Sequence, residues 1–435
     1  MRRKLSAIEH VIEGNLVFLV NLEGTFTPDQ LHSALSRVQR KHPALRALIR
    51  QEPDGLYYEP DSAPEIPLRI LSRVTKDDYQ NECELELTTA FAHNQPQLRA
   101  VWLRSELESD LIFTTSHRIC DGMSMLTIVR EILRSLHSGE ELIPYEPITP
   151  RDMIGDYQPP QLWKRKLTAG LMNALLRMIP TSRHTPENKE YFLQWDLDQA
   201  LSDALKQRCK TEGISVHSAL VVALDRVLFT VLNKKSPKWI DCPIDARRGR
   251  RGHLAALKSD MLFFGGGSLK IRTGLAPEKQ FWARAKMMSE EMRKQAKQEL
   301  LDIPGRYHFY EMLHPLSSGQ MQSIVRLGDA LKINGSWNRF ALSNLGNVVV
   351  GDDDAPFRLK DLRLYVHSFN VRVLGLVAYA FNGEMRFYYV GDEKCLSRSQ
   401  ADALKHEFMA LLQYQVSQTE DAVSEVRAGS MTVST

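Results

Sequence analysis

Helical and strand patterns alternate through the first third of the chain. Between Pro28 and Arg40 apolar residues recur at helical spacing, and Thr27 is placed to cap the first turn, so we predict a helix there. A second amphipathic helix covers 125–136 and ends at Gly139. Apolar runs between turn residues predict strands at 44–49, 56–59, 97–103 and 110–115.

The second half of the chain repeats this mixture. Helices are predicted at 198–212, 216–232 and 399–416. Strands are predicted at 191–197, 239–244, 261–264, 268–271, 339–343, 362–366, 373–381 and 384–390. Because helices and strands interleave in both halves without a strict βαβ repeat, the pattern predicts an α/β protein of the α+β sandwich type, and not a barrel or a bundle.

A proline-rich segment lies between the two halves. Five prolines fall within Ile143–Pro160, and this composition is typical of a connection between domains. We therefore divide the chain into an N-terminal domain at 1–160, a linker at 161–190 and a C-terminal domain at 191–435.

The linker contains a basic amphipathic stretch at 162–179. Its cations are Lys164, Arg165, Lys166 and Arg177. We expect this helix to pack on its own domain, with contact to a membrane surface as the alternative.

Composition narrows the class of protein. The chain has 435 residues, of which 43% are hydrophobic and 25% charged, which indicates a globular protein of two to three domains. No apolar run approaches the ~20 residues of a membrane-spanning helix, and no secretory stretch follows the basic start, so a cytoplasmic location is expected. The net charge of +3 is weaker than nucleic-acid binding normally shows, so no nucleic-acid partner is expected. Five scattered cysteines without a C-x-x-C pair predict reduced thiols and no metal site.

The string with the most chemical content is Phe113-Thr-Thr-Ser-His-Arg-Ile-Cys-Asp-Gly122, between a predicted strand and the helix at 125–136. A histidine at a strand end can project into a cleft, and its near-neutral pKa suits proton transfer in both directions. Asp121 can hold the turn or pair with a basic residue, and Gly122 permits tight backbone geometry. The alternative is that His117 is a hydrogen-bonded core histidine and Asp121 a helix cap.

This string resembles the H-H-x-x-x-D-G signature of the acyltransferase superfamily that includes condensation domains and chloramphenicol acetyltransferase. The alcohol acetyltransferase and polyketide-associated acyltransferase members are the most similar in pattern. Ser116 stands where the family commonly has its first histidine, and the absence of a D-F-G-W-G string argues against a plant BAHD enzyme. Further segments match in family order: 5–10, 40–46, 96–100, 211–224, 243–247 and 342–346.

The resemblance implies two chloramphenicol acetyltransferase-like domains that form a pseudodimer with a tunnel at their interface. His117 would then be the general base that deprotonates a hydroxyl or amine acceptor, which attacks a thioester. No metal and no permanently bound cofactor are implied. The co-substrate would be acyl-CoA or a phosphopantetheine thioester.

The resemblance also suggests roles for other residues. Asp121 and Gly122 would be structural in the active site, with Arg247 of the matched P-x-D-x-R segment as the partner of Asp121. Ser343 and Asn344 would bind the oxyanion or the acceptor, although a turn at a strand end explains them equally well. The basic run at 247–251 is either a solvated loop or an attractor of coenzyme A or pantetheine phosphates.

The predicted function is therefore a stand-alone acyltransferase of natural product or lipid biosynthesis. Its partners would be a small-molecule acceptor and either acyl-CoA or an acyl carrier protein. One alternative is a condensation-type enzyme that forms amides between carrier-bound substrates. Another is a catalytically inactive member with the same fold.

Overall fold

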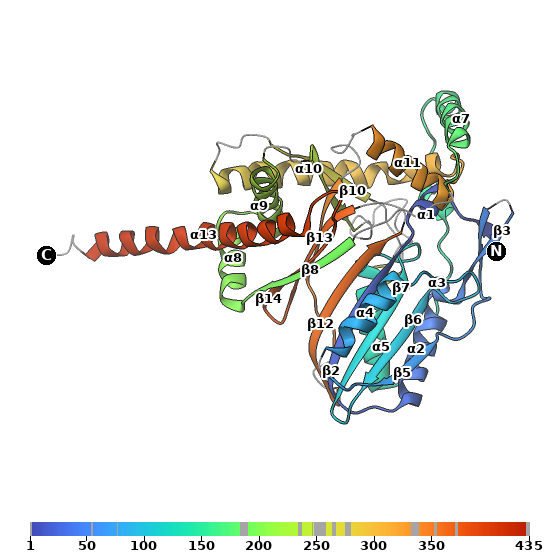
Figure 1. The fold of residues 1–435 in the computed structure, drawn as a ribbon, viewed down its shortest axis with the longest axis horizontal. Helices are drawn as coiled ribbons and strands as arrows, with labels where there is room; N and C mark the ends of the chain where they lie inside the picture. The colour runs from blue at the N-terminus through green and yellow to red at the C-terminus, as the bar shows by residue number, and fades with distance from the viewer. Residues whose placement is uncertain are drawn as a thin grey trace.

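The structure is a computed structural model. It describes residues 2–431 except for 54, 76, 183–189, 234–236, 246, 248–257, 263–266, 275–279, 332–338, 352–354 and 370–372. Two large sheets with helices packed on them form its two halves (Figure 1).

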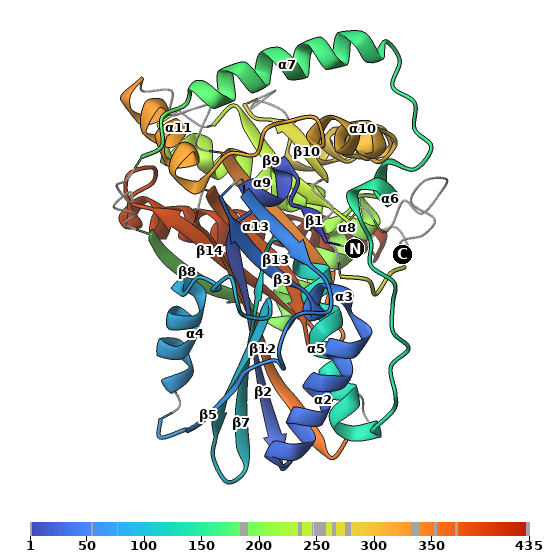
Figure 2. The same cartoon turned by 90° about the vertical axis from the view of Figure 1, so that its right-hand side faces the viewer.

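The N-terminal half is built on a five-stranded sheet in the order β12-β2-β7-β6-β5. Its strands are β2 (Gly14–Gly24), β5 (Leu68–Ser72), β6 (Leu98–Arg104), β7 (Glu108–Ser116) and β12 (Phe357–Ser368). Helices α2 (Pro28–Lys41) and α5 (Gly122–Ser138) cover one face, and α4 (Asp78–Thr88) covers the other (Figure 2). Alternate residues of β2 therefore enter two cores: Phe18 packs on the side of α2 and α5, whereas Leu19 packs on the side of α4.

The C-terminal half contains a six-stranded sheet in the order β10-β9-β11-β13-β14-β8. Its strands are β8 (Glu190–Leu197), β9 (Trp239–Ile244), β10 (Gly267–Arg272), β11 (Arg339–Asn347), β13 (Val373–Phe381) and β14 (Glu384–Asp392). One face packs on α8 (Gln199–Thr211), α9 (Val216–Val231), α10 (Phe281–Tyr310) and α13 (Arg398–Met431). From the opposite face, Val377, Tyr379 and Tyr388 join the core of the N-terminal half. The two sheets thus share one hydrophobic core.

The two halves are also joined by a strand that crosses from one to the other. Strand β12 comes from the C-terminal part of the chain but pairs antiparallel with β2 in the N-terminal sheet. A third sheet consists of β1 (Arg3–Lys4), β4 (Gly55–Glu59) and β3 (Leu48–Glu52). The other helices in the described part of the chain are α1 (Ala7–Val11), α3 (Pro43–Arg46), α6 (Pro150–Ile154), α7 (Leu162–Met178) and α11 (Ser318–Ala330).

The mixed α/β class is confirmed, with corrections to individual elements. The strand predicted at 44–49 is wrong in its first part, because Pro43 occupies the first turn of helix α3 and its fixed φ favours a helical start. The strand predicted at 261–264 is wrong at 261 and 262, which have no strand structure, while 263 and 264 lie outside the described residues. The tunnel and the division at 161–190 stay predictions, and β12 crosses that division.

Several negative features hold for the described residues. No single helix among them is both long and apolar enough to span a membrane, although α8 and α9, bent by 105°, satisfy that test when taken as a pair. The same part of the chain holds no group of three or more metal-ligating side chains. The five cysteines, all in the described part of the chain, form no disulfide, and four of them are buried.

Candidate active site

His117 lies at the point where the central sheet of the N-terminal half meets α5. Strand β7 is held on both sides, by β2 and by β6, and it ends at Ser116. The backbone N–H of His117 donates to the Gly14 carbonyl at 2.8 Å, and the N–H of Ile119 donates back to the Ser116 carbonyl at 3.2 Å. These bonds form a tight turn, so the sheet fixes the backbone that carries the imidazole.

The imidazole of His117 is oriented by its own loop. Its Nδ1 lies 2.8 Å from the carbonyl oxygen of Cys120. Because a carbonyl only accepts, Nδ1 carries the hydrogen and Nε2 carries the lone pair. Burial lowers the pKa of His117 below its ordinary value, against the opposing effect of the Cys120 carbonyl. A partly exposed, neutral histidine at pH 7 is the form that a general base requires.

Asp121 forms the predicted ion pair with Arg247. Nη2 of Arg247 lies 2.7 Å and 2.6 Å from the two carboxylate oxygens. Arg247 is 2% exposed, and it also reaches Asp245 at 2.9 Å and the Ser124 hydroxyl at 2.9 Å. Asp121 also caps α5 by accepting from the Ser124 N–H at 2.8 Å. The cap and the ion pair predicted as alternatives are therefore both present, and they connect the start of α5 to the C-terminal half.

The predicted oxyanion candidates lie on a strand that touches the same loop. A Cβ added to Gly122 would meet the Leu345 side chain of β11 at 3.0 Å, so this strand passes directly against the start of α5. Ser343 and Asn344 precede Leu345, and both are partly buried. The Asn344 side-chain oxygen accepts from the Gly346 N–H at 2.8 Å, which is the turn role weighed above.

The carbonyl of Gly14 holds the backbone of His117. The sequence did not indicate this role for Gly14. A Cβ on Gly14 would lie 2.0 Å from the His367 carbonyl oxygen on β12, where backbone must move. We expect Gly14→Ala to destabilise the protein by about 1–3 kcal/mol and to shift the backbone carbonyl that holds His117. Thermal unfolding measures this, with Gly170→Ala as the control, since its added Cβ meets nothing within 4 Å. Equal melting temperatures for Gly14→Ala and wild type would contradict the close approach.

A buried polar network beside the loop was also missed. Lys41 bridges Glu131 of α5 at 2.6 Å and Asp260 at 2.7 Å. His42 Nε2 lies 2.7 Å from Glu131, and the Tyr145 hydroxyl donates to Asp260 at 2.8 Å. The matched segment at 40–46 carried the available signal, but its partners are distant in sequence. The network ties α2 and α5 to the C-terminal half.

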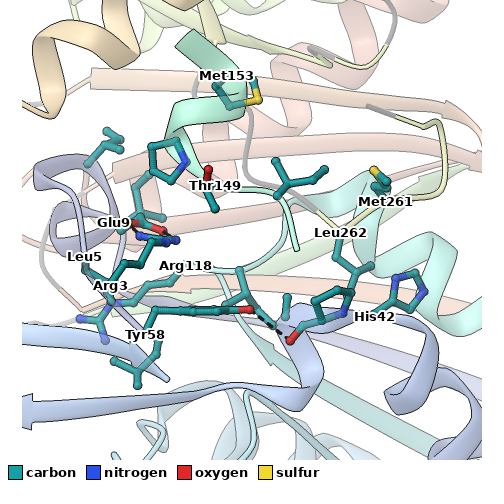
Figure 3. A pocket seen from close by; sticks show the side chains of 18 of the residues that line it. Arg3, Leu5, Glu9, His42, Tyr58, Arg118, Thr149, Met153, Met261 and Leu262 are labelled. Atoms are coloured by element: carbon teal, nitrogen blue, oxygen red, sulfur yellow. Dashed lines mark hydrogen bonds and ion pairs between the residues drawn. The ribbon is translucent and has the colours of Figure 1, made fainter. Parts of the chain in front are cut away.

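A cavity lies beside the residues that follow His117 (Figure 3). Arg118 and Ile119, the two residues after His117, form part of its wall, whereas His117 is not among the described residues that line it. The wall is apolar at Met153, Met261 and Leu262 (Figure 3). Polar side chains in the wall include Arg3, Glu9, His42, Tyr58, Arg118 and Thr149. A molecule with both apolar and polar parts fits this lining.

The basic run at 247–251, one predicted role of which is to attract phosphates, lies only partly within the described residues. Arg247 is occupied by its two carboxylates. The other cations of the run, at 248, 250 and 251, lie outside the described residues.

Comparison with known proteins gives distant sequence relatives, and no family model matches the chain. Chondramide synthase cmdD of Chondromyces crocatus is 26% identical over 290 residues, which cover 61% of this chain and 7% of that protein. A plipastatin synthase chain of Bacillus subtilis is 23% identical over 247 residues, covering 54% of this chain and 9% of that protein. The chain thus spans less than a tenth of the length of these relatives.

Solved structures match over almost the whole chain. Trichothecene 15-O-acetyltransferase TRI3 of Fusarium sporotrichioides has a TM-score of 0.67 at 11% identity, covering 94% of this chain and 95% of that chain. Polyketide synthase associated protein 5 of Mycobacterium tuberculosis has 0.64 at 13% identity, covering 95% and 98%. The condensation domain of the monacolin K polyketide synthase MokA has 0.64 at 12% identity, covering 96% and 97%.

These likenesses confirm the resemblance that the order of motifs predicted. The chain has the fold that the MokA condensation domain and the TRI3 acetyltransferase share.

Proposed function

We propose that the protein is an acyltransferase that moves an acyl group from a thioester to a hydroxyl or amine acceptor. The observation that supports this most strongly is the state of His117. Its Nδ1–H is held by the Cys120 carbonyl at 2.8 Å, so the basic lone pair lies on Nε2, on a rigid turn at the end of an interior strand.

In the proposed reaction, Nε2 of His117 takes the proton of the acceptor O–H or N–H as that atom attacks the thioester carbonyl carbon. The tetrahedral intermediate then breaks its C–S bond, and the thiolate leaves with the bonding electron pair. The imidazolium returns its proton to the thiolate. The products are an ester or amide and a free thiol, and His117 is neutral again. Ser343 and Asn344 are the candidates to donate hydrogen bonds to the oxyanion.

Direct transfer is favoured over a covalent intermediate on the nearby cysteine. Burial raises the pKa of Cys120 to about 12, so its thiol is protonated at neutral pH and is a poor nucleophile. Its sulfur also lies 2.8 Å from the Thr115 hydroxyl. We therefore assign Cys120 a positioning role through its backbone carbonyl.

A second candidate is condensation between carrier-bound substrates. It is favoured by the sequence relatives, which are named as synthases of chondramide and plipastatin. The chemistry at His117 would be the same, with an amine acceptor and the thioester on a phosphopantetheine arm.

The donor distinguishes the two candidates. Thiol release is measured from acyl-CoA and from acyl groups carried on a phosphopantetheinylated carrier protein, each with alcohol and amine acceptors. Transfer from free acyl-CoA supports the stand-alone acyltransferase. Transfer confined to carrier-bound donors with an amine acceptor supports condensation. No acceptor-dependent thiol release from either donor would contradict both proposals.

A further inference from the structure

Helix α7 packs on the protein with a face that carries Arg165, Asn173 and the small Ala169, which is 3% exposed. Arg165 donates from Nη1 to the Gly305 carbonyl at 2.9 Å. Asn173, two turns later, donates to the Met312 carbonyl at 2.8 Å and accepts from the His314 N–H at 2.6 Å. Arg165 and Asn173 lie eight residues apart and therefore share one face of the helix. The side that faces the protein thus combines a small apolar side chain with the hydrogen-bonding groups of Arg165 and Asn173.

The opposite side of α7 is apolar and exposed. Five large side chains at spacings of three and four residues form one stripe, and each is between 59% and 79% exposed. We call this set the α7 stripe: Trp163, Leu167, Leu171, Leu175 and Met178. Soluble helices normally turn such a face towards the core, so this amphipathic helix is oriented in the reverse sense. At 1.5 Å per residue, the stripe is about 22 Å long.

All the charged side chains of α7 are basic. Its 17 residues contain four basic side chains and no acidic one, so the helix carries +4, whereas the whole chain carries +3. Arg165 faces the protein, while Lys164, Lys166 and Arg177 are exposed beside the stripe. The Lys164 ammonium lies 5.4 Å from the Trp163 ring centroid. An exposed apolar stripe flanked by cations is complementary to a surface that is apolar inside and anionic outside.

The position of α7 allows contact with a flat surface. The helix is the uppermost element in both views of the fold, and in Figure 2 its length runs along the top of the molecule. A plane laid on this end therefore touches the helix before α10 or α11.

We propose that α7 is an interfacial helix that docks the protein on an anionic lipid surface. The α7 stripe inserts at the boundary between headgroups and acyl chains, and the three exposed cations pair with lipid phosphates. Trp163, with an apolar ring and an indole N–H, is suited to that boundary. The inference does not depend on the proposed acyl transfer, since it rests on a helix outside the His117 site.

Vesicle flotation of the full chain tests the proposal. One vesicle population is pure phosphatidylcholine, and the other contains phosphatidylglycerol as well. We expect binding to the anionic vesicles that weakens as salt is added, because exposed ionic contacts are screened. We expect Leu167→Glu with Leu171→Glu to reduce the bound fraction at least 10-fold, and Lys164→Glu with Lys166→Glu to reduce it several-fold. A matched control is Leu85→Glu, at a residue 50% exposed on helix α4, which should bind like wild type.

Two results would overturn the proposal. The first is a wild-type protein that does not bind anionic vesicles, or a Leu167→Glu, Leu171→Glu variant that binds them as well as wild type does. The second is a wild-type dimer in sedimentation velocity that this variant converts to a monomer, because the stripe would then be covered by a second copy of the chain. Circular dichroism of every variant confirms that the helix is retained.

Discussion

Replacing His117 with alanine is expected to lower kcat for acyl transfer by about 10²–10⁴-fold, the usual contribution of a positioned general base. The variant removes Nε2, which we assign as the proton acceptor. It also removes the Nδ1 hydrogen bond to Cys120, at a stability cost of about 1 kcal/mol. Steady-state thiol release at saturating acceptor, together with thermal unfolding, separates the two effects.

A second variant distinguishes a catalytic role of His117 from a structural one. In His117→Asn the side-chain amide N–H is placed to replace the Nδ1 hydrogen bond to the Cys120 carbonyl, but no basic nitrogen remains. We expect this variant to melt near wild type and to lose activity as His117→Ala does. The control is His93→Ala, which alters an exposed histidine. Wild-type kcat in His117→Asn would show that the imidazole only holds the turn.

The second large effect is expected from breaking the buried ion pair at the start of α5. Arg247→Ala leaves Asp121 and Asp245 without their shared cation, and we expect a loss of about 3–5 kcal/mol in the free energy of unfolding. Asp121→Ala should cost less, because Arg247 keeps Asp245 and the Met261 carbonyl at 3.2 Å. The two single variants are therefore not expected to lose equal amounts of stability. Denaturant unfolding midpoints measure both variants.

The double variant tests whether Asp121 and Arg247 act as one unit. We expect Asp121→Ala with Arg247→Ala to cost clearly less than the sum of the single variants, because the second change removes a charge already left without its partner. Arg134→Ala is the control, since Arg134 and Glu140 are 2.6 Å apart but about half exposed, and its cost should stay below about 1 kcal/mol. Additive costs for Asp121 and Arg247 would contradict the pairing.

The sequence predicted elements whose signal is local. The helix at 28–40 is observed as α2 at Pro28–Lys41, with Thr27 accepting from the Gln30 N–H at 3.2 Å as its cap. The helix at 125–136 begins earlier, at Gly122, because Asp121 serves as the cap. Strand β13 was predicted with its observed bounds. In each case the apolar period and the end signals lie within the element itself.

Elements defined by distant neighbours were missed. Strand β2 has apolar residues on both faces, because α4 covers one and α2 with α5 cover the other, so it lacks the alternation of a half-buried strand. Helix α10 contains Pro304, a residue that normally ends a helix, and its thirty residues gave no helical prediction. The pairing of β12 with β2 joins segments more than 300 residues apart, and no local pattern encodes it.

The candidate site follows the same rule: its residues that are close in sequence were predicted, and those brought in by tertiary contacts were not. His117, Asp121 and Gly122 lie within one short string, and the matched segment around 243–247 supplied Arg247, which the structure brings to Asp121. Gly14 and Asp260 carried no signal of their own. Gly14 matters because β12 passes close to it, and Asp260 matters because Lys41 reaches it, so both depend on tertiary contacts.

The most direct test of the central claim follows the proton on His117 itself. The pKa of its imidazole is measured by NMR titration of ¹⁵N-histidine-labelled protein, with His117→Asn to assign the signal, and is compared with the acid limb of kcat/KM against pH. Since burial lowers this pKa and only the neutral imidazole accepts a proton, the account predicts that activity persists to below about pH 6.5. The midpoint of the NMR titration and the midpoint of the acid limb of kcat/KM should coincide. The NMR spectrum should also show the Nδ1–H tautomer of His117 at neutral pH. An acid limb that does not follow the titration of His117, or that persists in His117→Asn, would contradict the account.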